Sequence, residues 1–237
     1  MTTAQRPDRQ LPLKLYPPQD QTLEHFIVGA NAEAHAQAGA LARGESLRPL
    51  HLWGGAATGK THLLAAACAG AAKQGLRPVY LPLKETSHDL DPSVCEGLGT
   101  LDLICVDDVD AIGGRGDWEL ALLRLYNQLA DQGGRWLSAS TVNPQEAMIN
   151  LPDLKSRLGW GLVIHLQPLT DDLRREVLMQ RARRRGFALS KEVADYLLHR
   201  VPRDLKQLCA LLDRLDAASL SNQRHVTIPL AKTLLGK

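Results

Sequence analysis

Residues 54–61, GGAATGKT, restrict the fold of this chain more than any other feature, because they combine a glycine, four further residues and then Gly-Lys-Thr. They lie between a short apolar run, 49–53, and an alanine- and leucine-rich stretch, 61–74. Such a loop, between a strand and a helix, points backbone N–H groups at phosphates, and the helix N-terminus adds positive potential. A chance glycine turn is the alternative. The residues expected to surround the phosphates, with the lysine reaching the β- and γ-phosphates, are Gly54, Gly55, Ala56, Ala57, Thr58, Gly59, Lys60, Thr61 and His62.

Apolar strand-like runs alternate with helical stretches over the first two thirds of the chain. This alternation predicts an α/β fold, with a parallel sheet and helices on both faces. The prolines of the run 77–83 favour an edge position or a strand end. The run 101–108 is continuously apolar before its acids, as in a strand buried on both faces. The predicted strands are 49–53, 77–83, 101–108, 135–141 and 161–166, and the predicted helices are 61–74 and 118–132.

After about residue 167 the pattern becomes helical only. Thr170 and Ser190 are suited to cap the first two helices, because their hydroxyls can accept a bond from a free backbone N–H. The expected helices are 171–185, 191–200, 203–221 and a short one from about Pro229. The sequence therefore predicts three parts: a tail over 1–21, an α/β nucleotide-binding domain over 22–166 and a small all-helical lid domain over 167–237.

Composition excludes several classes of protein. The chain has 237 residues, 44% of them hydrophobic and 23% charged, as in an ordinary soluble globular protein. It has no apolar stretch of about 18 residues that could cross a bilayer, and its N-terminus has no signal-peptide core. The net charge of +2 is too small to indicate nucleic-acid binding by itself. The four cysteines are far apart, as expected for buried thiols. We expect a cytoplasmic protein with no membrane partner.

Acidic and hydroxyl side chains end two of the predicted strands. A phosphate-binding loop needs an acid at the end of a neighbouring strand, and Asp107 can hold Mg²⁺ together with the hydroxyl of Thr61. Asp108, beside it, could orient the attacking water. Two adjacent acids could also form a solvated turn, but they follow four apolar residues. Ser140 and Thr141 are candidates for a polar contact near the γ-phosphate, although hydroxyl residues often end strands for other reasons.

Arg157 lies in a short segment just before the last predicted strand. An arginine there could serve the chain's own nucleotide, or it could reach the nucleotide of a neighbouring molecule as an arginine finger. The alternative is a local ion pair, for example with Asp153.

Several of these motifs together resemble the AAA+ domain of the bacterial replication initiator DnaA. They are the phosphate-binding loop, ICVDDVDAI, LPDLKSRLGWGL and the all-helical C-terminal part. The segment TLEHFIVGANAEA, 22–34, is similar to the adenine-side segment of that family, with Asn31 in its polar position. The 237 residues show neither the DNA-reading helix-turn-helix domain nor the N-terminal helicase-interacting domain of DnaA. The chain thus looks like the Hda group of DnaA-related regulators.

The resemblance implies an activity and a set of partners. Hda-like proteins bind adenine nucleotide, ADP or ATP with Mg²⁺, and they bind the DNA-loaded sliding clamp of DNA polymerase III, which makes their contact with DNA indirect. They make DnaA hydrolyse its ATP, and Arg157 would be the finger that enters the DnaA-bound nucleotide. The lid position that senses nucleotide holds Lys206, with Arg203 one turn upstream. Because lysine cannot reproduce a bidentate arginine contact, weak intrinsic ATP hydrolysis is expected. Self-association into a homo-oligomer stays open.

The tail carries a candidate clamp-binding peptide, QLPLKL, at residues 10–15. Clamp-binding peptides resemble a glutamine followed by alternating leucines, and here Gln10 and Leu11, with Leu13 and Leu15, fit that pattern. An extended segment can lay its leucines in an apolar groove. The alternative is an edge strand of the domain that follows.

Two other classes of protein remain as alternatives. An AAA+ initiator or helicase loader has a similar nucleotide-binding domain, but it leaves QLPLKL unexplained. A small-molecule P-loop kinase would explain neither the segment around Arg157 nor the helical C-terminal part.

Overall fold

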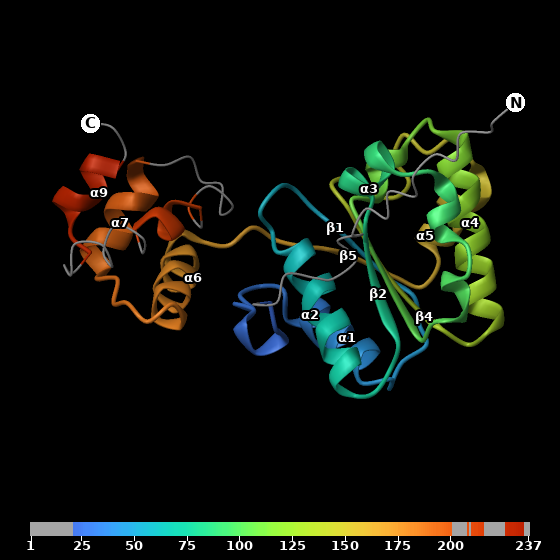
Figure 1. Cartoon of the computed structure of the whole chain (residues 1–237), viewed down its shortest axis with the longest axis horizontal. Helices are drawn as coiled ribbons and strands as arrows, with labels where there is room; N and C mark the ends of the chain where they lie inside the picture. Colours follow the sequence, from blue (N-terminus) through green and yellow to red (C-terminus); the bar gives the residue numbers. More distant parts are fainter. Residues whose placement is uncertain (1–20, 201–207, 209, 216–225, 235–237) are drawn as a thin grey trace, which may run out of the picture.

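Five parallel strands form the central sheet of the N-terminal part (Figure 1). The structure is a computed structural model that describes residues 21–200, 208, 210–215 and 226–234. The predicted parallel sheet is confirmed, and β2 lies at its edge, as its prolines indicate. The strands, in their order across the sheet, are β2 (Pro78–Pro82), β3 (Leu103–Asp107), β4 (Arg135–Ser140), β1 (Leu50–Trp53) and β5 (Leu162–His165).

The register of the strands brings their carboxyl ends to one edge of the sheet. Trp53 at the end of β1 lies opposite Ser140 of β4 and His165 of β5. Asp107 at the end of β3 lies opposite Pro82 of β2. In open parallel sheets this edge is where ligands bind. The phosphate-binding loop, the acids and the hydroxyl residues predicted from sequence therefore emerge side by side.

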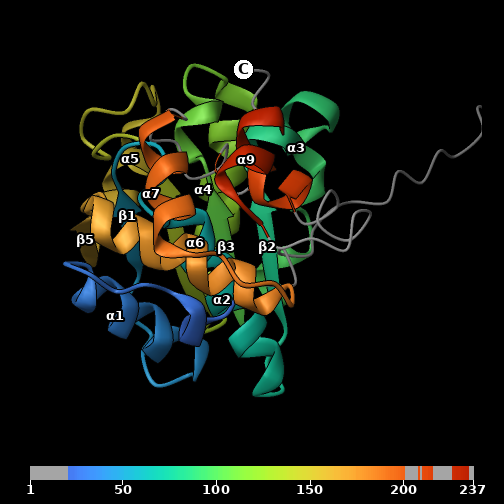
Figure 2. The same cartoon turned by 90° about the vertical axis from the view of Figure 1, so that its left-hand side faces the viewer.

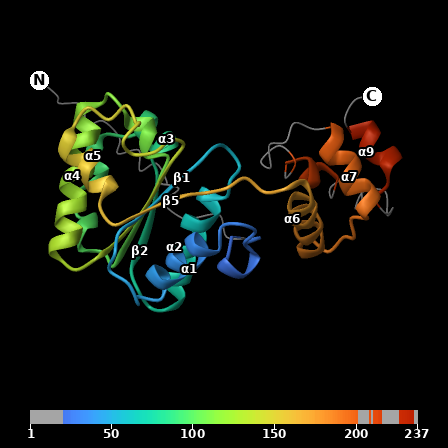
Figure 3. The same cartoon turned by 180° about the vertical axis from the view of Figure 1, so that it is seen from behind.

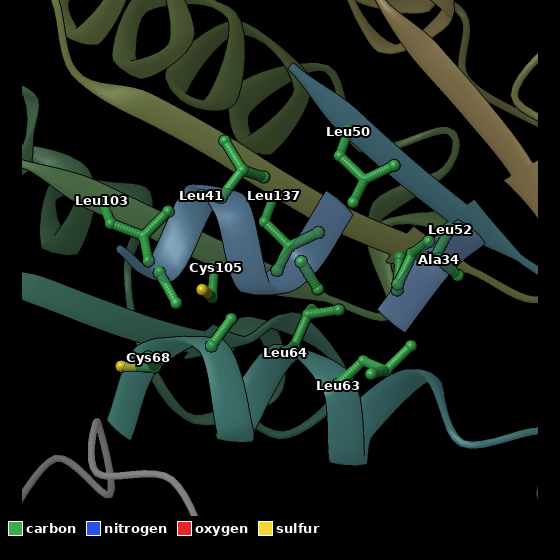
Figure 4. Close-up of a cluster of buried hydrophobic side chains, with 14 of the residues drawn as sticks. Ala34, Leu41, Leu50, Leu52, Leu63, Leu64, Cys68, Leu103, Cys105 and Leu137 are labelled. Carbon is green, nitrogen blue, oxygen red and sulfur yellow. The ribbon is translucent and has the colours of Figure 1, made fainter. Parts of the chain in front are cut away.

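Helices α1 (Ala32–Ala42) and α2 (Lys60–Lys73) cover one face of the sheet. Figure 4 shows leucines of α2, β1, β3 and β4 meeting Ala34 and Leu41 of α1 in this core. Alanines let the two helices approach closely, and a Cβ atom added to Gly70 would lie 3.3 Å from Ala42 Cβ. The sequence did not predict α1, because its buried side is mostly alanine and carries little hydrophobic contrast.

Three helices pack on the opposite face: α3 (Leu83–Asp89), α4 (Gly116–Asp131) and α5 (Pro152–Gly159). The predicted apolar side of α4 is confirmed, since its leucines and Trp118 are buried. Short 3₁₀ turns connect the elements: η1 (Leu23–His25), η2 (Pro92–Cys95), η3 (Leu98–Thr100) and η4 (Val109–Ile112). The cysteines of the described residues are free and buried, as expected: Cys68, Cys95 and Cys105.

The C-terminal part is helical, as predicted, with a hydrophobic core of its own. Thr170 Oγ1 accepts a hydrogen bond from Leu173 N at 3.3 Å, and Ser190 Oγ accepts one from Val193 N at 3.3 Å, so both predicted caps are confirmed. Figures 1 and 3 show the connector running from β5, past the loop between β1 and α2, to this unit, and Figure 2 shows α6 and α7 in front of the sheet. The helices are α6 (Asp171–Arg184), α7 (Lys191–Arg200) and α9 (Ile228–Leu234).

No helix in the described part of the chain combines the length and the apolar character needed to span a membrane.

Candidate functional site

The phosphate-binding loop adopts backbone angles that its small residues permit. Gly54 has φ 153°, and a Cβ there would lie 2.8 Å from the carbonyl oxygen of Leu166. Gly59 has φ 100°, precedes the first turn of α2, and would bring a Cβ to 2.8 Å from the ring of Phe26. Larger residues cannot occupy these two positions without strain or displacement. The loop is thus tightly enclosed by the β5–α6 connector and the N-terminal segment.

Lys60 is buried within this loop and donates to its carbonyl oxygens. The Nζ–O distances are 2.6 Å to Gly54 and 2.8 Å to Gly55. Burial lowers the pKa of Lys60, while the nearby carboxylates, that of Asp107 foremost, oppose the decrease. Thr58 Oγ1 donates to Gly55 O at 3.0 Å and braces the same turn. The cation predicted to reach the phosphates therefore lies inside the loop that would hold them.

Asp107 ends β3 as predicted and is held in place by a residue that the sequence did not single out. Tyr80 of the adjacent strand donates its hydroxyl to Asp107 Oδ2 at 2.8 Å, and Asp108 N donates to Oδ1 at 3.1 Å. Burial, together with the Asp107 carboxylate, raises the pKa of Tyr80, which keeps the hydroxyl protonated as a donor. Burial raises the pKa of Asp108 to about 6, with Asp107 and Asp110 adding to the increase. A role of Asp108 in orienting the attacking water stays a prediction.

A cavity of about 390 Å³ opens beside these acids. The hydroxyl of Thr61 and the carboxylate of Asp107 are oxygen donors of the kind that Mg²⁺ prefers, so the residues present fit that ion. The groups that line the cavity are Thr61, Tyr80, Lys84, Glu85, His88, Asp107 and Asp108.

His62, included in the predicted phosphate-binding set, contacts the N-terminal segment. Its Nε2 donates to the carbonyl of Thr22 at 2.9 Å, and its ring packs edge-on against Phe26. His35 donates to the carbonyl of Leu23 at 3.0 Å and stacks on the same Phe26 ring. His35 of α1 and His62 of α2 thus both hold the N-terminal segment, and in this arrangement His62 Nε2 is occupied by backbone.

Asn31 links the N-terminal segment to the connector before the helical unit. Its Nδ2 donates to Gln167 O at 3.0 Å, and its Oδ1 accepts from Gln167 N at 2.8 Å. The residue is 4% exposed. Both polar ends of the side chain are therefore bound to backbone, so an adenine contact by Asn31 stays a prediction.

Ser140 and Thr141 have different surroundings. Ser140 is buried, and its hydroxyl donates to Val142 O at 2.5 Å. Because that hydroxyl proton is already used, His51 Nε2, 2.8 Å from Ser140 Oγ, carries a proton and donates to it. Ser138 lies 2.8 Å from the other ring nitrogen of His51. Burial lowers the pKa of this histidine to about 4. Thr141, in contrast, is exposed, and both its N–H and its hydroxyl bind the carboxylate of Asp110. Of the two candidates, only Thr141 lies beside the acidic cluster.

Arg157 is on the exposed side of α5. Its guanidinium carbon lies 5.8 Å from the centroid of the Tyr126 ring, in a cation–π contact. Within the described part of the chain Arg157 has no ion pair, so the alternative of a pair with Asp153 is not seen. Leu154 and Leu158 of the same helix are buried and fix it against the core. The arginine is thus presented outward from a packed helix.

The remaining predicted site residues lie outside the described residues. They are Gln10, Leu11, Leu13, Leu15, Arg203 and Lys206.

Comparison with known proteins assigns the chain to a family. A model of the bacterial DnaA ATPase domain matches residues 18–165, and a model of the Hda lid domain matches residues 171–235. The chain is an Hda-like member of the DnaA-related AAA+ family. Together the two matches cover the sheet unit and the helical unit of this Hda-like protein.

Solved structures agree with this assignment. Domain III of DnaA from Thermotoga maritima superposes with a TM-score of 0.81 at 26% identity, over 92% of this chain and 96% of that one. DnaA from Aquifex aeolicus, solved with AMPPCP bound, gives a TM-score of 0.71 at 25% identity, over 87% and 68% of the two chains. The RuvB branch-migration motor of Thermotoga maritima, at 16% identity and a TM-score of 0.68, shares the fold alone. The AAA+ fold predicted from sequence is confirmed.

Proposed function

We propose that this Hda-like protein is a cytoplasmic regulator of replication initiation that makes DnaA hydrolyse its ATP. In this role it binds adenine nucleotide and the DNA-loaded sliding clamp, and it supplies Arg157 to the nucleotide held by DnaA. The observation that carries the proposal is the exposed Arg157 on α5, which has no carboxylate partner among the described residues. A finger must be free to meet phosphate, so an exposed arginine without an ion pair supports this role.

Adenine nucleotide binding by this chain is supported by the loop around Lys60 and by the nucleotide analogue in the related DnaA structure. Thr61 and Asp107 are the residues that would hold Mg²⁺, which when bound neutralises charge on the phosphates. Asp108, whose pKa burial raises to about 6, would orient or deprotonate the attacking water. The distinctive requirement of the proposal is nevertheless the action of Arg157 on a partner, because the loop alone would also suit an initiator or a helicase loader.

The test measures ATP hydrolysis by DnaA with this protein, the sliding clamp and primed DNA, leaving out each component in turn. Stimulation should require all three, and Arg157→Ala should abolish it while retention on clamp-loaded DNA is unchanged. Since a finger supplied in trans contributes roughly 10³–10⁵ in rate, the loss should be close to complete. Arg157→Lys should restore little, because an ammonium cannot replace the planar fork of donors.

A matched control is Arg48→Ala, which removes an exposed arginine that lies before β1 and has no ion pair among the described residues. It should stimulate DnaA like the unchanged protein. If the unchanged protein gives no stimulation over DnaA alone, the proposal is wrong. Binding to origin DNA or to a helicase under the same conditions would instead favour the initiator or loader class.

A further inference from the structure

Glu119, in the first turn of α4, is a buried carboxylate bound entirely by backbone. The side chain is 1% exposed, and within the described part of the chain it forms no ion pair. Oε1 accepts from Gly114 N at 2.9 Å and from Asn150 N at 3.1 Å. Oε2 accepts from Asn150 N at 3.0 Å and from Leu151 N at 2.7 Å. Three amide donors thus replace the water that an ionised carboxylate loses on burial.

These donors come from two loops of different origin. Gly114 follows η4, the turn that begins directly after Asp108, whereas Asn150 and Leu151 immediately precede α5. The two loops lie close together, because a Cβ on Gly113 would lie 2.8 Å from the carbonyl oxygen of Met148, in the loop before α5. One carboxylate therefore joins the loop after the acidic strand to the N-terminus of the helix that carries the exposed arginine.

The position of this anchor sets the direction of α5. Leu151 is the N-cap of the helix, and Arg157 lies about 9 Å further along its axis. A tilt of about 10° at the anchor would move the backbone of Arg157 by roughly 1.5 Å and the tip of its side chain by more. Displacements of about 1 Å can lower a catalysed rate by about 10². The buried leucines of α5 fix its inner side, and the backbone bonds to Glu119 fix the start of its first turn.

We infer that Glu119 is a positioning residue for Arg157, because its carboxylate joins the loop after the acidic strand to the first turn of α5. The inference rests on the proposed function of Arg157 and adds a residue through which the finger is held. Glu119 also connects the acidic strand to the arginine. The chain runs from Asp108 through η4 to Gly114, whose N–H donates to Glu119.

The test replaces Glu119 by glutamine, which keeps one acceptor oxygen and turns an NH₂ group towards backbone N–H donors. In the DnaA hydrolysis assay the maximal stimulated rate should fall 10- to 100-fold, and the concentration for half-maximal stimulation should stay within about twofold. Glu33→Gln, in the exposed first turn of α1, is the matched control and should leave both quantities unchanged. A larger half-maximal concentration with an unchanged maximal rate would overturn the inference.

Two further measurements separate positioning from a general loss of structure. The Glu119→Gln, Arg157→Ala double variant should be no slower than Arg157→Ala alone, because Glu119 acts only through the arginine. Amide hydrogen exchange, measured without DnaA, should show lost protection at Gly114, Asn150 and Leu151 in Glu119→Gln but not in Arg157→Ala. Retained protection in Glu119→Gln would also overturn the inference.

Should Glu119→Gln fail to fold, Glu119→Asp keeps the charge but shortens the reach, and the same rate and exchange changes are required of it. If either Glu119 variant stimulates DnaA fully while Arg157→Ala is inactive, only the inference about Glu119 is contradicted, and the proposed function stands. If Arg157→Ala still stimulates DnaA like the unchanged protein, the proposed function is contradicted instead.

Discussion

His51, buried on β1, should make the stability of this protein fall on mild acidification. Its ring lies between two serine hydroxyls, and burial lowers its pKa from 6.5 to about 4, with a nearby carboxylate, Asp110, partly offsetting the decrease. The unfolded chain binds a proton near the ordinary pKa, whereas the folded chain does not until about pH 4. The contribution of His51 is therefore fully present above pH 6.5, declines as the pH falls towards 4 and is constant below that.

The magnitude follows from the two pKa values. At pH 5 the imidazole is about 97% protonated in the unfolded chain and about 10% protonated in the folded chain. Between pH 7 and pH 5 this difference lowers the free energy of unfolding by about 2 kcal/mol. Asp108 acts in the opposite direction, because its pKa is raised to about 6 and acidification relieves its buried charge. A raw pH profile would thus mix two effects of opposite sign.

Urea denaturation of the unchanged protein and of His51→Gln, at pH 7, 6 and 5, separates them. The glutamine amide has a donor and an acceptor for the two serines but does not titrate, and Asp108 is present in both proteins. The difference between the two free energies of unfolding should change by about 2 kcal/mol between pH 7 and pH 5. Curves that stay parallel would show that the imidazole is not kept neutral by the fold.

Three further changes probe the nucleotide-binding side. Gly59→Ala should lower the free energy of unfolding by about 1–3 kcal/mol in urea titrations, because φ is positive there and the Phe26 ring would lie 2.8 Å from the new Cβ. Gly55→Ala is the control and should be near neutral, because no atom lies within 4 Å of its Cβ position. Asn31→Ala should cost about 1–3 kcal/mol by removing two hydrogen bonds to the connector; no change in the urea midpoint would contradict this. Tyr80→Phe should weaken Mg²⁺-dependent nucleotide binding several-fold in calorimetry, because Asp107 loses its hydroxyl donor; unchanged Mg²⁺ dependence would contradict it.

The sheet and the phosphate-binding loop could be predicted because their signals are local. A buried parallel strand needs a short apolar run, and the loop needs glycine at fixed spacing, so both can be recognised within ten residues. The prolines of β2 even indicated its edge position. By the same reasoning α1 and α3 were missed: α1 buries alanines, and α3 is a helix of only 7 residues that directly follows a strand.

The supporting polar contacts could not be predicted, because they join distant parts of the chain. Tyr80 and Asp107 are 27 residues apart, Glu119 and Asn150 are 31 apart, and His51 and Ser138 are 87 apart. In sequence nothing marks Tyr80, Glu119, His51 or Ser138 as a partner in such a contact. Only the pairing of strands and the packing of α4 against α5 show which polar groups share one buried space.

The bond between Asn31 and Gln167 has a mechanical consequence for the helical unit. Gln167 is fixed to the sheet unit on one side, and Thr170 already caps α6 on the other. Only Pro168 and Leu169 lie between these two fixed points, and the proline ring holds its own φ near about −65°. The joint therefore has very few free torsions. A change in the position of the helical unit relative to the sheet would therefore be concentrated in the torsions of residues 168–170.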